Sequence, residues 1–298
     1  MNQDLQNITK FQSWLLAARP KTLLAAFVPV IVGSALAINI GKFFLLNSLI
    51  ALLCSLLIQI GTNFTNDLYD FLKGADNHKR KGPLRVLSSG LISVTEMKMG
   101  SFLIFFLSFL FGLYLVKSAG IVILIIGVVS IIAGIAYTAG PFPLAYNGLG
   151  DIFVFMFFGV VGTMGTYYLH TKEFSILSFL ASIPVGALIT NILIINNYRD
   201  IEEDKAAGKN TLAVLLGKNF TRYQFIFFII ISFLIPAFLF FVFHFHIWIF
   251  LPYITIPLAY RLILMIYTFD GLQLNKTLEL TAKFSAIFGI LFAAGLAL

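Results

Sequence analysis

The sequence predicts an all-α, polytopic membrane protein. Of its 298 residues, 59% are hydrophobic and only 11% are charged, and the mean hydropathy is +0.96. Nine apolar segments approach the roughly 20 residues that a helix needs to cross the hydrocarbon core of a bilayer. A soluble domain of this length does not need so much apolar surface. We therefore expect one transmembrane domain over residues 1–298, built as a bundle of nine helices.

The residues before the first span are amphipathic. Trp14 suits the membrane interface, and Arg19, Pro20 and Lys21 lead into the apolar run. The first 21 residues lack an early apolar region and a small-residue cleavage site, so we expect no secretory signal peptide. The predicted spans are 22–40, 46–70, 97–116, 120–138, 149–169, 174–197, 225–243, 246–268 and 279–298.

Only two connections between these spans are long, and both are rich in charge. They are residues 71–96, after the second span, and residues 198–224, after the sixth. With the N-terminus inside, 17 of the 20 Lys and Arg residues fall on the inner side. The positive-inside rule therefore predicts an inner-membrane protein with a cytoplasmic N-terminus and an outer C-terminus. Both long loops then share the cytoplasmic face.

Composition also excludes several classes of protein. One cysteine, Cys54, rules out an intrachain disulfide, and four scattered histidines form no metal-binding motif. The net charge of +7 does not indicate nucleic-acid binding, because the cations lie at the boundaries of apolar segments.

The end of the second predicted span carries a polar face. Asn63, Asn66, Asp67 and Asp70 fall within about 100° of arc on a helix that turns 100° per residue. An isolated carboxylate at the bilayer centre costs roughly 2.5 to 3.5 kcal/mol, so such residues indicate a cavity, a cation or a partner. Carboxylates suit Mg²⁺, which proteins usually hold together with substrate phosphates. The cations that follow, which suit phosphates, are Lys79, Arg80, Lys81 and Arg85.

A second acidic element follows the sixth predicted span. Asp200 and Asp204 are four residues apart and share a helix face, with Asn196 one turn earlier. Glu203 can share the face of Asp200, and its role as a ligand or as a solvated loop carboxylate stays open. The lysines of this element are Lys205 and Lys209.

Two carboxylate clusters at one face need cations to compensate their charge, since like charges held close together are unfavourable. Two Mg²⁺ ions bridged by a diphosphate would neutralise both clusters and make the diphosphate a leaving group. An allylic carbon released in this way becomes a carbocation, which needs a dry pocket and is stabilised by aromatic faces. The candidate tyrosines are Tyr137, Tyr146, Tyr167 and Tyr168.

These residues resemble the UbiA superfamily of intramembrane prenyltransferases, over about residues 14 to 220. Two acidic motifs at the ends of the second and sixth spans carry the resemblance. The matching motifs are Asn63-x-x-Asn66-Asp67-x-x-Asp70, Gly82-Pro83-x-Arg85, Asn196-Asn197-x-Arg199-Asp200-x-x-x-Asp204, Gly208-Lys209-x-Thr211, Arg19-Pro20-Lys21 and Tyr137-Thr138-x-Gly140-Pro141.

Within the superfamily, the chain most resembles the 1,4-dihydroxy-2-naphthoate polyprenyltransferases of menaquinone synthesis. Gly74 stands where the hydroxybenzoate branch usually has its third aspartate, and the next aspartate is Asp76. Asp76 can be a ligand only if the helix breaks at Gly74. Asp151 stands where many members have Glu. The resemblance implies Mg²⁺ as cofactor, and polyprenyl diphosphate and 1,4-dihydroxy-2-naphthoate as substrates, with diphosphate and CO₂ released.

The resemblance also implies roles for individual residues. The catalytic, metal-binding residues are expected to be Asp67, Asp70, Asp200 and Asp204. The residues expected to bind the diphosphate are Asn63, Asn66, Lys79, Arg80, Lys81, Arg85, Lys205 and Lys209. Those of the carbocation or acceptor pocket are expected to be Tyr137 and Tyr146.

Two other functions are compatible with the same residues. One is prenyl transfer to another acceptor, such as 4-hydroxybenzoate, haem or a sugar phosphate. The other is secondary transport, with an ion site between two related halves. Transport does not explain why both acidic clusters lie at one face with basic loops after them.

Overall fold

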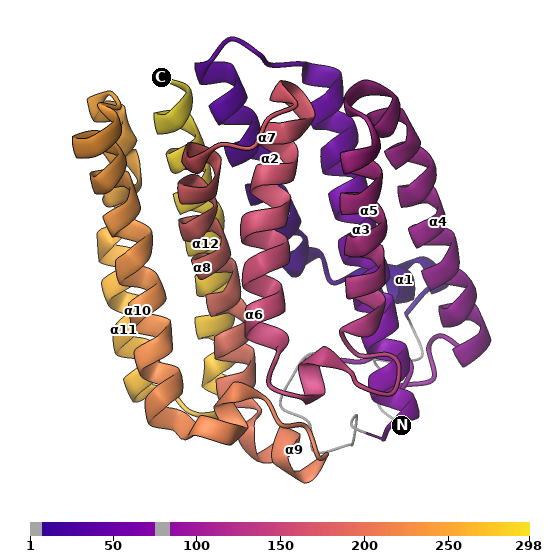
Figure 1. The fold of residues 1–298 in the computed structure, drawn as a ribbon. Coiled ribbons are helices and arrows are strands. Elements are labelled where there is room, and N and C mark those ends of the chain that lie inside the picture. The colour runs from indigo at the N-terminus through magenta and orange to yellow at the C-terminus, as the bar shows by residue number, and fades with distance from the viewer. Residues whose placement is uncertain (1–7, 75–83) are drawn as a thin grey trace.

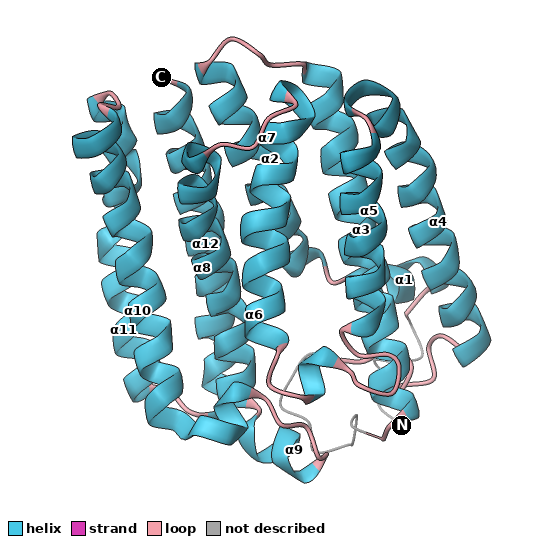
Figure 2. Cartoon of the chain, viewed as in Figure 1, coloured by secondary structure: helices cyan, strands magenta, loops and turns pink. Residues whose placement is uncertain are grey.

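The computed structural model describes residues 8–74 and 84–298. Over these residues the chain forms helices joined by turns and loops, without a β-strand (Figure 2). An isolated parallel bridge joins Asn147 to Asn210. The all-α class predicted from composition is confirmed.

The described residues contain eight helical segments that are long and apolar enough to cross a membrane, and α5 is a shorter apolar helix. The predicted number of nine spans is therefore approximate. The helices are α1 (Lys10–Ala18), α2 (Pro20–Asn39), α3 (Leu45–Leu72), α4 (Val94–Ala119), α5 (Ile121–Ala136), α6 (Gly150–Val154), α7 (Gly162–Thr171), α8 (Ile176–Arg199), α9 (Ile201–Ala206), α10 (Leu212–Phe243), α11 (Ile256–Thr268) and α12 (Leu274–Ala297).

Shorter helical pieces complete two of these spans. A π-helical segment, Phe155–Val161, joins α6 to α7, so the three pieces form one membrane-length element. A 3₁₀ segment, Ile247–Thr255, leads into α11 in the same way. The other 3₁₀ turns are Leu144–Tyr146 and Gly271–Gln273.

The largest departure from the predicted spans is at α10. The apolar pattern predicts a span over 225–243, but the helix begins at Leu212, inside the predicted loop. Gly217 interrupts the helix with a φ of 77°, a conformation that glycine adopts without strain. The kink at this glycine separates the apolar residues 212–216 from the rest of the helix.

The N-terminal helix α1 buries one side, with Ser13 and Ala17, against the bundle and leaves Phe11, Leu15 and Leu16 exposed, as expected of an amphipathic helix. The ring of Trp14 lies 5.1 Å from that of Phe64 on α3, and it belongs to a cluster with Leu68 and Met97. Arg19 adopts a left-handed φ of 52°, which separates α1 from α2, and Pro20 starts α2. Proline at this position is favourable because its missing N–H would have no helical partner.

Small residues set how closely the helices approach. A Cβ at Gly33 of α2 would lie 2.5 Å from the backbone oxygen of Thr163 on α7. A Cβ at Gly159 would lie 2.6 Å from the Cα of Gly186 on α8. Such close backbone contact is typical of helix pairs in membranes, where van der Waals packing replaces the hydrophobic effect.

The long helices run between two ends of the bundle (Figure 1). The C-terminal ends of α3 and α8 reach the same end, where α1, α9 and the loop after α5 also lie, and the last turn of α12 lies at the other. The two acidic elements of the sequence therefore lie at one end of the molecule.

Candidate active site

The first acidic element lies on one face of α3, as its spacing predicts. Helix α3 continues through Asp70 to Leu72, and Asp67 and Asp70 are only 2% and 3% exposed. The guanidinium group of Arg85 donates a hydrogen bond of 2.8 Å to Asp70 Oδ2, and its Nη1 lies 3.8 Å from Asp67 Oδ1. Arg85, itself buried, thus holds both carboxylates from the loop before α4.

The other oxygen of Asp70 faces the second half of the chain. The Tyr146 hydroxyl donates a 2.8 Å hydrogen bond to Asp70 Oδ1. The Lys209 ammonium lies 3.9 Å from Asp70 Oδ1 and 3.9 Å from Asp204 Oδ1. The backbone N–H of Asn210 donates to the carbonyl of Tyr146, which ties the two loops together. Lys209 therefore lies between the two acidic elements.

In the second element, Asp200 forms a buried ion pair. Arg199 donates from Nε to Asp200 Oδ1 and from Nη2 to Oδ2, both at 2.6 Å. Its remaining donors reach Asn275 on α12 and Asn196 on α8. The side chains of Arg199 and Asp200 are 1% and 7% exposed. The guanidinium thus fixes this carboxylate at the junction of α8 and α9.

The aspartates of the two acidic elements suit a divalent cation that is bound together with a diphosphate. Among the described residues, no three His, Cys, Asp or Glu side chains come together as a metal site. One or two carboxylates with substrate phosphates is the usual environment of protein-bound Mg²⁺. The four buried or nearly buried aspartates would repel a diphosphate unless cations lay between them. The donor set therefore fits Mg²⁺ held jointly with a diphosphate.

Several other predicted residues lie where the sequence alone could not place them. Asn63 donates to the carbonyl of Ala18 and to Thr22, so its amide holds α1 and α2 against α3. Asn66 accepts a hydrogen bond from Thr138 and lines the cavity described below. Lys205 is exposed and lies outside the lining of that cavity. The predicted residues outside the described part of the chain are Asp76, Lys79, Arg80 and Lys81.

Lys73 is a site residue that motif analysis misses. Its ammonium donates to the carbonyl of Thr138 at 2.8 Å and lies 4.5 Å from the ring centre of Tyr146, which Lys209 also covers at 5.0 Å. Burial lowers the pKa of Lys73, while the nearby Asp70 charge opposes the shift. Its position three residues after Asp70, on the same helix face, is the signal in the sequence.

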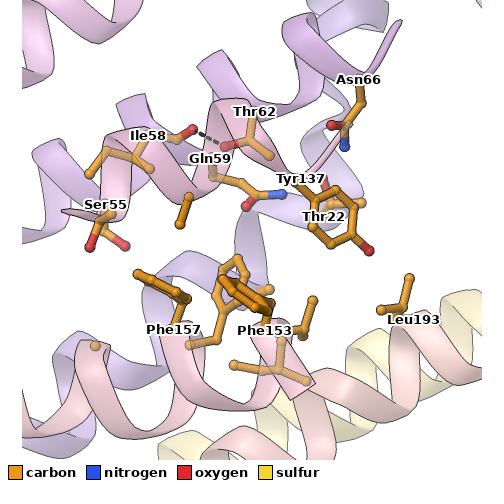
Figure 3. A pocket seen from close by; sticks show the side chains of 18 of the residues that line it. Thr22, Ser55, Ile58, Gln59, Thr62, Asn66, Tyr137, Phe153, Phe157 and Leu193 are labelled. Carbon is orange, nitrogen blue, oxygen red and sulfur yellow. Dashed lines mark hydrogen bonds between the residues drawn. The ribbon is translucent and has the colours of Figure 1, made fainter. Parts of the chain in front are cut away.

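A cavity of about 660 Å³ extends from the carboxylates into the bundle. Its polar end includes Asp70, Asp200, Asp204, Glu203, Arg85 and Lys209, and its far end is apolar. Figure 3 shows Phe153 and Phe157 on one wall, opposite Ser55 and Gln59, with Tyr137 pointing inward.

The four candidate tyrosines separate at this cavity. Tyr137 lines it, whereas Tyr146, Tyr167 and Tyr168 are absent from the described residues of the wall. The structure therefore does not place Tyr146 where a carbocation would form. Its hydroxyl is committed to Asp70 and its ring to two ammonium groups.

Comparison with known proteins identifies relatives over nearly the whole chain. The UbiA prenyltransferase family matches residues 26–288. A 1,4-dihydroxy-2-naphthoate octaprenyltransferase of Haemophilus influenzae is 37% identical over 96% of both chains. The enzyme of the same name from Escherichia coli is 44% identical over 74% of this chain and 73% of its own length.

Solved structures share the fold. A UbiA homolog from Archaeoglobus fulgidus, bound to DMAPP and Mg²⁺, superposes with a TM-score of 0.65 at 20% identity, over 94% of this chain and 99% of its own. A UbiA homolog from Aeropyrum pernix superposes with a TM-score of 0.69 at 13% identity, over 91% of this chain and 97% of its own. At these identities the likeness shows a common membrane-helix architecture.

Proposed function

Because the chain belongs to the UbiA prenyltransferase family, we propose that this multi-pass membrane enzyme transfers a polyprenyl group from its diphosphate to 1,4-dihydroxy-2-naphthoate. The observation that carries the proposal is the position of Lys209, 3.9 Å from a carboxylate of each acidic element at the mouth of one cavity. The relatives named as 1,4-dihydroxy-2-naphthoate octaprenyltransferases support the choice of acceptor.

The polar end of the cavity suits the diphosphate. Asp70, Asp200 and Asp204 line this end, and Asp67, which is absent from the described lining, lies one turn before Asp70 on α3. Together they would hold Mg²⁺, which supplies charge neutralisation to the leaving diphosphate. Arg85 and Lys209 would be within reach of the oxygens of a diphosphate bound there, because both already lie against Asp70. A pre-positioned guanidinium and ammonium stabilise the charge that develops as the carbon–oxygen bond breaks.

The apolar part of the cavity suits the prenyl chain and the cation at its first carbon. Phe153 and Phe157 line the cavity on one side, and Tyr137 points into it from the other (Figure 3). Aromatic faces stabilise a cation, and the apolar surroundings exclude the water that would capture it. Leu115 and Ile123, farther along the cavity, offer the surface that an isoprenoid tail buries.

We also propose that the polar end faces the cytoplasm. The cations concentrate at this end of the predicted topology, with 17 of 20 on the inner side. A cytoplasmic mouth gives a charged, water-soluble naphthoate direct access, while the prenyl diphosphate enters from the membrane with its headgroup at the same face.

The first test is metal removal. Protein in proteoliposomes, supplied with a polyprenyl diphosphate and the naphthoate, is expected to form prenylated product with Mg²⁺ and to lose turnover in EDTA. Excess Mg²⁺ should restore it, because the carboxylates need divalent charge to accept a diphosphate. Product formation is measured by mass spectrometry. Equal turnover with EDTA and with Mg²⁺ would contradict the metal requirement. Product formed with hydroxybenzoate and none with the naphthoate would contradict the proposed acceptor.

The second test is Lys209→Ala. We expect the KM for the prenyl diphosphate to rise about tenfold, equivalent to about 1.4 kcal/mol, while the KM for the naphthoate stays within about twofold. The reason is that Lys209 faces the carboxylates and only 18% of its side chain is exposed. Lys276→Ala, which removes an exposed cation from the first turn of α12, is the matched control. Equal rises in both KM values would remove Lys209 from the headgroup site.

A further inference from the structure

One aspartate on the cavity wall, Asp151, differs from the three aspartates at the polar end. Asp70, Asp200 and Asp204 each lie beside a basic side chain, namely Arg85, Arg199 or Lys209. Asp151, at the start of α6, forms no ion pair with the described residues although it is only 5% exposed. Burying a carboxylate without a cation costs free energy, so the presence of Asp151 at this position needs an explanation other than an ion pair.

Two amide groups hold Asp151 in place. Gln224 on α10 donates from Nε2 to Asp151 Oδ2 at 2.9 Å, and Asn197 on α8 donates to Oδ1 at 3.4 Å. The Oε1 atom of Gln224 is buried without a hydrogen-bond partner among the described residues. The glutamine thus presents its donor to the carboxylate and leaves its own oxygen unsatisfied. Each carboxylate oxygen accepts about two hydrogen bonds, so one donor at each leaves capacity for a ligand.

The Tyr137 hydroxyl lies beside the residue that precedes Asp151. A Cβ placed on Gly150, the residue before Asp151, would lie 3.2 Å from the Tyr137 hydroxyl oxygen. That hydroxyl makes no hydrogen bond to the described residues, and Figure 3 shows the tyrosine pointing into the cavity. Asp151, an acceptor-only group, and the Tyr137 hydroxyl therefore both border the cavity that Phe153 also lines.

We propose that Asp151, in the cavity that Tyr137 also lines, binds the ring hydroxyl of the aromatic acceptor and takes its proton during prenyl transfer. This inference rests on the proposed function and assigns the acceptor end of the same cavity. A phenolic hydroxyl is neutral and donates a hydrogen bond that a buried carboxylate can accept. The hydroxyl of Tyr137 supplies a donor for the carboxylate group or second oxygen of the acceptor.

The proton and electrons balance as follows. The ring O–H proton moves to Asp151, and the oxygen electron pair shifts into the ring. The ring carbon that bears the carboxylate forms a bond to the first prenyl carbon, whose bond to the diphosphate oxygen breaks with its pair leaving on diphosphate. Loss of CO₂ returns a pair to the ring, and the oxygen regains the proton from Asp151.

The test compares Asp151→Asn, Asp151→Glu and wild type in proteoliposomes. For Asp151→Asn, we expect kcat/KM for the naphthoate to fall about a hundredfold, as for removal of a general base, with the KM for prenyl diphosphate within about twofold. Asp151→Glu should recover a large part of the loss. Asp270→Asn, at a side chain that is 81% exposed, controls for loss of negative charge.

A binding measurement separates recognition from structure. Without prenyl diphosphate and Mg²⁺, Asp151→Asn should bind 1,4-dihydroxy-2-naphthoate more weakly than wild type, while 2-naphthoate, which lacks the hydroxyls, should bind both equally. Unchanged naphthoate binding and turnover in Asp151→Asn would overturn the role assigned to Asp151 and would leave the proposed function standing. A lowered Tm with equal losses for both substrates would do the same. Failure of wild type to prenylate the naphthoate would overturn the proposed acceptor as well.

Discussion

Asp67→Asn is expected to abolish most Mg²⁺-dependent turnover while leaving the protein folded. Asp67 is 2% exposed at the polar end of the bundle, and the substitution removes a full negative charge with almost no change in shape. Loss of one preorganised electrostatic contact typically costs about a hundredfold in kcat, and we expect at least that. Stability should change little, because Arg85 keeps its 2.8 Å hydrogen bond to Asp70. Turnover in proteoliposomes and Tm in detergent measure the two effects.

The matched control for this variant is Glu202→Gln. Glu202 is an exposed carboxylate on α9, at the same end of the bundle (Figure 1). It should keep wild-type turnover and the same dependence on Mg²⁺ concentration. Wild-type activity in Asp67→Asn would contradict the metal role of this aspartate. A large fall in Tm would show that Asp67, and not Asp70, is the main partner of Arg85.

Local helical spacing is what made the site predictable. The face shared by Asn66, Asp67 and Asp70 follows from the 100° turn per residue, and α3 remains helical to Leu72. Charge distribution predicted that both acidic elements lie at one end, which Figure 1 confirms. The spans were predicted to within a few residues where apolar runs end abruptly, as at Asn39 and Arg199.

The contacts between distant loops could not be predicted in the same way. Lys209 comes within 3.9 Å of Asp70 next to the point where Asn210 pairs with the backbone of Tyr146, and no local pattern encodes that pairing. The Tyr146 hydroxyl at this pairing donates to Asp70, and Tyr146 is absent from the described cavity lining. Asn63 has the spacing of a site residue, yet its amide binds α1 and α2. Spacing shows which residues share a face, and tertiary packing decides what that face meets.

The geometry also separates enzyme from transporter. A secondary transporter binds its ion near the middle of the membrane, between broken helices. Here the aspartates lie at the ends of α3 and α8, and the cavity beyond them becomes apolar and aromatic. An apolar cavity ending at a charged mouth suits a lipid with a polyanionic headgroup. This arrangement agrees with the prenyltransferase family to which the chain belongs.

Asp200→Asn is expected to lose both turnover and stability, in contrast to Asp67→Asn. Arg199 is 1% exposed and makes two hydrogen bonds of 2.6 Å to Asp200. Its other partners, Asn196 and Asn275, are neutral. Removing one partner of a buried ion pair typically costs about 3 to 5 kcal/mol, because the remaining charge stays buried. We therefore expect a clear fall in Tm together with at least about a hundredfold loss of kcat.

The double variant Arg199→Gln with Asp200→Asn separates the two effects. It removes both charges, and a buried pair replaced by neutral groups is often close to neutral for stability. Tm should therefore return most of the way to the wild-type value, while turnover stays lost, because the carboxylate that would help to hold Mg²⁺ is still missing. Recovery of turnover in the double variant would show that Asp200 acts only by neutralising Arg199. An unchanged Tm in the single variant would show that another group compensates the guanidinium.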